Sequence, residues 1–126
     1  MCGKVRYEIR GAPRVTYYCH CGKCRKQSGS SFATNVIVLK EDFFIVAGEE
    51  AISSWVSSPG KRRYFCSGCG SPIYSHGENR KQIVSVRCGT LDGDLPLPPS
   101  VHAFVASKAN WIEITDDLPQ HAEYFA

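Results

Sequence analysis

Apolar and polar residues alternate along much of the chain with the two-residue period of half-buried β-strands. Val5, Tyr7 and Ile9 alternate with charged residues, and the turn-forming residues 11–13 then interrupt the pattern. Residues 57–60 read Ser-Ser-Pro-Gly, which is typical of a hairpin turn. The segments expected to form strands are 5–10, 15–18, 32–39, 43–46, 52–56, 63–65, 72–75, 83–86, 102–105 and 111–114.

Helical potential is confined to residues 21–26, which we expect to form a turn or two before a turn at 27–31. The chain has no internal repeat, linker or low-complexity tract, and its 126 residues suit one domain spanning 1–126. The pattern therefore predicts a mainly β fold of short strands in antiparallel sheets. It does not fix the order of the strands.

Composition and charge narrow the function classes. A hydrophobic content of 43% is typical of a globular protein, and no apolar run approaches the length of a membrane span. The net charge of +3 includes two basic groups, Lys23/Arg25/Lys26 and 61–63, each beside a cysteine cluster. Such groups occur in nucleic-acid-binding proteins, but compensation of metal-bound thiolates is the favoured interpretation because three-residue basic groups are common on solvated faces. A nucleic-acid-binding module is also disfavoured because no long basic stripe interleaved with aromatic residues is present.

The seven cysteines carry most of the chemical information. An odd number argues against a fully paired disulfide framework, and no secretory hydrophobic segment precedes the first cysteine. Both features favour thiolate-bound metal in a reducing compartment, the cytoplasm. Zinc is the expected ion because it is redox-silent and accepts tetrahedral thiolate sites.

The first cysteine cluster, Cys19-x-Cys21-x-x-Cys24, places three thiols on six residues. These thiols can present a three-sulfur face to one ion and leave one tetrahedral vertex, which the protein fills in structural sites and substrate or water fills in catalytic sites. In an extended segment His20 points away from this face, so we expect it to support the ligands or to lie at the surface.

The second cluster, Cys66-x-x-Cys69, lies between two expected strands, with glycines that permit the tight backbone of a zinc knuckle. Free or redox-active thiols are the alternative interpretation. Cys2 can complete this site if the first strand pairs beside the knuckle. Cys88 ends an alternating strand and is expected to be a small buried residue.

The cysteine clusters and their surroundings together resemble a known family, the glutathione-dependent formaldehyde-activating enzymes and their centromere-protein-V relatives. The resemblance covers nearly the whole chain in the right order. Its pieces are Cys2-Gly3-Lys4-Val5-Arg6-Tyr7, Cys19-His20-Cys21-x-x-Cys24-Arg25 with Ser28-Gly29-Ser30, Phe65-Cys66-x-x-Cys69-Gly70-Ser71, Gly89-Thr90-Leu91-Asp92, and Ser107-Lys108-Ala109-x-Trp111 with Asp117-Leu118-Pro119.

The resemblance implies an Mss4-like fold, a tent of β-sheets stapled by two zinc ions. It implies that Cys19, Cys21 and Cys24 hold a catalytic zinc with an open vertex. It further implies that Cys66 and Cys69 hold a structural zinc with an N-terminal C-x-C pair, of which Cys2 is the second member and the first would precede Met1. Water, Cys88 and another residue of the chain are the alternatives for the remaining ligand of that site.

The activity implied by the resemblance is that of a carbon–sulfur lyase run backwards, S-(hydroxymethyl)glutathione synthase, which condenses formaldehyde with the thiol of glutathione. A non-catalytic zinc-binding module that contacts nucleic acid or protein is one alternative. A relative of the same fold with a different small-molecule substrate is another, because a shared fold does not fix the substrate. The sequence leaves the oligomeric state and any catalytic residue beyond the zinc ligands open.

Overall fold

The protein is mainly β, as a computed structural model that describes residues 1–125 shows. The single α-helix of this range is α1 (Gly22–Ser28), where the sequence predicts one or two helical turns, and no helix in it is long and apolar enough to span a membrane. The strands are β1 (Arg6–Ile9), β2 (Val15–Cys19), β3 (Ala33–Leu39), β4 (Phe43–Ala47), β5 (Ile52–Ser58), β6 (Lys61–Cys66), β7 (Pro72–Gly77), β8 (Ile83–Arg87) and β9 (Val101–Ala103).

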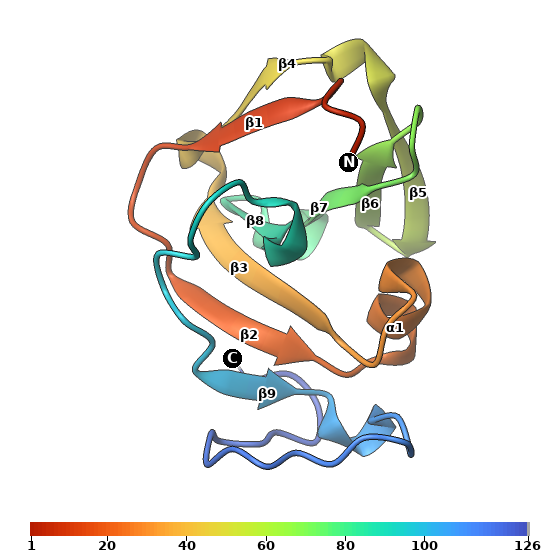
Figure 1. Cartoon of the computed structure of the whole chain (residues 1–126), viewed down its shortest axis with the longest axis vertical. Coiled ribbons are helices and arrows are strands. Elements are labelled where there is room, and N and C mark those ends of the chain that lie inside the picture. Colours follow the sequence, from red (N-terminus) through yellow and green to blue (C-terminus); the bar gives the residue numbers. More distant parts are fainter. Residues whose placement is uncertain (126) are drawn as a thin grey trace.

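Two sheets make up the fold. The larger has the strand order β5-β6-β7-β8-β3-β2-β9, and the smaller pairs β1 with β4 (Figure 1). All neighbouring strands are antiparallel except β2 and β9, which run parallel. The expected class of short antiparallel strands with at most short helical turns is thus confirmed, apart from that one pair.

The two faces of the large sheet differ in chemistry. Val36, Val38, Val84 and Val86 form an apolar cluster on one face, against which aromatic residues of β1 and β4 pack. Side chains alternate between the faces of a strand, so the odd-numbered neighbours of these valines lie on the other face. That face carries polar residues at directly opposed positions, including Asn35, Arg63, Ser75, Ser85 and Arg87. A buried polar face on a central sheet marks the place to look for function.

The C-terminal part differs from the sequence-based expectation. A strand is predicted for 102–105, but β9 ends at Ala103 because Phe104 adopts the left-handed conformation with φ 58°. The strand predicted for 111–114 is wrong. Side chains hold that segment instead: Lys108 Nζ donates to the carbonyl of Ile112 at 2.6 Å, and Trp111 Nε1 donates to Ser31 Oγ at 2.9 Å.

Candidate functional site

The structure brings Cys19, Cys21 and Cys24 together, as the sequence predicts. Their sulfur atoms all lie within 4.8 Å of one another. Cys19 ends β2, Cys21 is the N-cap of α1, and Cys24 lies in its first turn. The Cys21 Sγ accepts the backbone N–H of Cys24 at 3.3 Å, so the turn of the helix itself sets the spacing of the thiols.

Cys19 and Cys24 differ in how readily they ionise. Hydrogen bonds from Cys19 and Cys21 lower the pKa of Cys24, and the Arg63 guanidinium, 3.5 Å from the Cys24 Sγ, lowers it further. Hydrogen bonds with Cys21 and Cys24, and then burial, raise the pKa of Cys19. A divalent cation among the sulfurs would allow all three to ionise, because metal-bound thiols lose their protons.

The second cluster contains Cys2, Cys66 and Cys69, whose sulfur atoms also lie within 4.8 Å of one another. The Gly70 N–H donates to the carbonyl of Cys66 at 2.7 Å, and Gly70 has φ 78°, a left-handed conformation that favours glycine. The Ser71 backbone N–H is the main cause that lowers the pKa of Cys69, to about 6. The sequence predicts that Cys2 reaches this site if the first strand pairs beside the knuckle. Instead β1 pairs with β4, and Cys2 lies in the segment before β1.

Both clusters fit a tetrahedral thiolate site. A zinc ion with Zn–S bonds of about 2.3 Å holds its sulfurs roughly 3.8 Å apart. The Sγ atoms of Cys2 and Cys66 are separated by 3.8 Å. Cys88 belongs to neither cluster and packs, half-buried, beside the valine cluster of the sheet. The prediction that Cys88 is a small packing residue therefore agrees with its place, although it is not fully buried.

A cavity of about 740 Å³ lies on the polar face of the large sheet and reaches Cys19, Cys21 and Cys24. Its volume suits a small-molecule ligand. Six of its lining residues are cations, and none of its described lining residues is acidic. The cations are Lys23, Lys26, Lys61, Arg63, Arg80 and Arg87.

The sequence anticipates part of this basic lining. Both basic groups beside the cysteines contribute to it, and Arg63 touches a cysteine sulfur, which supports charge compensation there. Arg25 and Arg62 are exceptions. The Arg25 guanidinium lies 6.0 Å from the centre of the Trp111 ring, and Arg62 donates to Ser54 Oγ outside the cavity. Arg80 and Arg87 have no signal in the cysteine motifs. Arg87 could have been found from the alternation in its strand, because its odd number places it on the face opposite Val84 and Val86.

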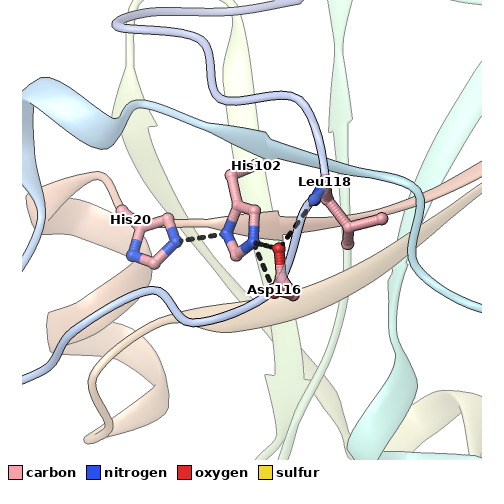
Figure 2. A network of polar contacts seen from close by, with 4 residues as sticks. All are labelled: His20, His102, Asp116 and Leu118. Atoms are coloured by element: carbon pink, nitrogen blue, oxygen red, sulfur yellow. Dashed lines mark hydrogen bonds and ion pairs between the residues drawn. The ribbon is translucent and has the colours of Figure 1, made fainter.

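His20 lies away from the thiols, as predicted, but it is fully buried rather than at the surface. Its Nε2 lies 2.9 Å from the His102 Nδ1, and the His102 Nε2 lies 3.0 Å from Asp116 (Figure 2). In a neutral His102 whose Nε2–H donates to the Asp116 carboxylate, Nδ1 accepts the proton of His20 Nε2. Burial, and then His102, lower the pKa of His20 to about 4, so this histidine is neutral at pH 7. Sequence reasoning missed His102 and Asp116, because they are distant from the cysteine motifs.

Replacing His102 by leucine is expected to lower the free energy of unfolding by about 1–3 kcal/mol, because it leaves the polar Nε2 of the buried His20 without its partner. Urea titration followed by circular dichroism measures this loss. His76→Leu is the matched control: its Nε2 bonds the carbonyl of Lys81 near the surface, so its loss should be smaller. Equal midpoints for the two variants would contradict a stabilising role for the histidine pair.

The fold and the sites define a class: a mainly β protein with two three-cysteine clusters that could hold metal, one of them at a cationic cavity. The family model "Glutathione-dependent formaldehyde-activating enzyme" matches residues 1–107. The chain belongs to this family, as its motifs predict.

Similar proteins agree with this assignment. A Halomonas elongata protein named "Putative glutathione-dependent formaldehyde-activating enzyme" is 31% identical over 121 residues, which cover 90% of this chain and 76% of that protein. A Fusarium vanettenii protein of the same name is 28% identical over 120 residues, and the match covers 95% of this chain but 55% of that longer protein. A crystal structure of a Rhodobacter sphaeroides protein has a TM-score of 0.63 at 21% identity and covers 75% of this chain and 86% of that chain. This last likeness supports the fold alone.

Proposed function

We propose that the chain is one zinc-dependent unit that condenses formaldehyde with glutathione, a carbon–sulfur lyase acting in the direction of synthesis. Cys19, Cys21 and Cys24 are the proposed ligands of the catalytic zinc, and Cys2, Cys66 and Cys69 those of a structural zinc. When bound, the catalytic zinc would supply a soft acceptor that keeps the substrate thiol ionised. Membership of the family supports the reaction, and the donor set of three thiols supports zinc.

The observation that carries the proposal is the placement of the first thiol cluster at a cavity lined by cations. Glutathione brings one thiol and two carboxylates, so its recognition needs a soft centre beside positive charge. Lys23 lies between Cys21 and Cys24 on α1, Lys26 follows Cys24 on the same helix, and Arg80 lines the same cavity. We assign these three residues to the carboxylates, because all three are long cations that line the cavity.

The shape of the site favours this activity over a module that contacts nucleic acid. Cations that read a phosphate backbone form an open stripe on the surface. Here six of them line a cavity, and Arg63 and Arg87 are each only 6% exposed. A small anionic ligand reaches such residues, whereas a polymer does not.

Cobalt substitution tests the proposal directly. Glutathione added to the cobalt-loaded protein should increase the sulfur-to-metal charge-transfer absorption saturably, because a substrate thiolate joins the three cysteine sulfurs. S-Methylglutathione is the matched control: it carries the same carboxylates but cannot form a thiolate, so it should leave the bands unchanged. An identical spectrum with and without glutathione would refute thiol binding at the cluster.

A further inference from the structure

Two buried arginines lie beside the thiol end of the cavity. Arg63 and Arg87 are each 6% exposed, and both line the cavity. Arg63 extends from β6 and Arg87 from β8, on the polar face of the large sheet. Burying a guanidinium is costly unless an anion or a full set of acceptors compensates it. Their surroundings therefore need an explanation.

Neutral groups hold both side chains. Arg63 Nη1 and Arg87 Nη2 donate to the same Gln27 Oε1 at 3.0 and 3.3 Å, and Arg87 Nη1 donates to Asn35 Oδ1 at 2.9 Å. Arg63 Nε is buried and has no hydrogen-bond partner among residues 1–125. Within that range neither arginine has a carboxylate within ion-pair distance. The two positive charges thus have one adjacent source of negative charge, the cysteine sulfurs.

The negative charge of the cysteine sulfurs does not balance the two guanidinium charges. Three thiolates around one divalent cation carry a net charge of −1, whereas the two guanidiniums carry +2. Lys61 adds a third cation on the same face of β6, two residues before Arg63. The thiol end of the cavity therefore retains positive charge, and it is prepared for a further anion close to the sulfurs.

We propose that Arg63 is a catalytic residue that stabilises the negative oxygen formed when the substrate thiolate adds to the aldehyde, with Arg87 reinforcing the positive charge. This inference rests on the proposed function. The sulfur of the thiolate donates an electron pair to the aldehyde carbon and a C–S bond forms. The π electrons of the C=O bond move to the oxygen, which then takes a proton from water to give the hydroxymethyl product. The proton lost by the thiol balances the one taken up.

The position of Arg63 indicates that its guanidinium contacts the aldehyde oxygen rather than a carboxylate of the substrate. Its Nη1 lies 3.5 Å from the Cys24 Sγ, at the edge of the thiol cluster. The carboxylates of glutathione are at the far ends of the peptide, several bonds from the reacting sulfur. The aldehyde oxygen, in contrast, is bonded to the very carbon that the sulfur attacks. A hydrogen-bond donor next to the cysteine sulfurs, such as Arg63, is therefore close enough to stabilise that oxygen.

The test compares Arg63→Met with Arg62→Met. Methionine preserves much of the buried volume without the charge, and Arg62 is the exposed neighbour whose guanidinium bonds Ser54 Oγ outside the cavity. Exchange spectroscopy of formaldehyde and glutathione gives the turnover, and the cobalt titration gives the glutathione affinity. We expect Arg63→Met to slow turnover about 100-fold, the usual effect of losing one oxyanion donor. Its glutathione affinity should change less than about threefold, and Arg62→Met should match the wild type in both.

Four results would count against the inference. Turnover of Arg63→Met at the wild-type rate would overturn it. A decrease in turnover no larger than the decrease in glutathione affinity would also overturn it, because Arg63 would then be a binding residue. If Arg63→Met fails to fold or to hold metal, Arg63→Lys decides, because lysine keeps the charge but lacks the planar fork. It should turn over at least about tenfold more slowly than the wild type, and wild-type turnover would overturn the inference. No exchange by the wild-type protein above the buffer rate would overturn this inference and the proposed function together.

Discussion

Replacing Cys66 by serine is expected to give unfolded or insoluble protein. Cys66 is 2% exposed at the end of β6, and its sulfur lies 3.8 Å from that of Cys2. In the proposed structural site these sulfurs share a zinc ion whose binding contributes directly to folding. Structural zinc binding is worth roughly 10–16 kcal/mol in small zinc domains, whereas a whole domain is stable by about 5–15 kcal/mol. Soluble yield and far-UV circular dichroism measure the effect.

Cys88→Ser is the matched control for this change. Cys88 is half-buried and lies outside both clusters, and burial raises its pKa to about 11, so it is a neutral thiol at pH 7. Serine should therefore cost about 1 kcal/mol, as typical single substitutions do. If Cys66→Ser were as stable as Cys88→Ser, the second cluster would not be a structural site.

The motifs that identify both clusters are local, which is why the sequence reveals them. Cys21 and Cys24 are joined by one helical turn, and Cys66 and Cys69 by one knuckle, so their spacing alone brings the sulfurs together. The alternating strands are equally local. Strand pattern does not predict pairing, however: β9 comes after a long connection from β8 and pairs in parallel with β2, which lies far from it in the sequence.

The cavity and the histidine pair depend on contacts between distant residues, so the sequence gives little sign of them. Arg63 and Arg87 both donate to Gln27, although they lie 36 and 60 positions after it in the sequence. His20 and His102 are 82 positions apart and meet because β9 lies beside β2. Alternation predicts which side of a strand each residue occupies. It does not predict that β3, β6, β7 and β8 will bring their polar sides to one cavity.

Replacing Cys21 by serine is expected to abolish turnover and remove one metal equivalent while the protein stays folded. The proposed catalytic zinc would lose one of its three cysteine sulfurs, and a neutral hydroxyl is a poor replacement for a thiolate. The fold should survive because serine is among the best N-cap residues and can accept the Cys24 N–H that the Cys21 sulfur accepts at 3.3 Å. Helix α1 therefore keeps its first turn.

Cys21→Ala separates the cap of α1 from the proposed metal ligand. Alanine removes both, so it should lose the same metal equivalent as Cys21→Ser and also about 1 kcal/mol of unfolding free energy. Elemental analysis gives the metal content, exchange spectroscopy the turnover, and urea titration the stability of each variant. Collapse of the far-UV spectrum in Cys21→Ser would contradict this division, because it would make the first cluster a second structural staple. A full metal complement and normal turnover in Cys21→Ser would instead show that Cys21 is not a metal ligand. The metal ion would then need a different set of donors from the one that α1 presents.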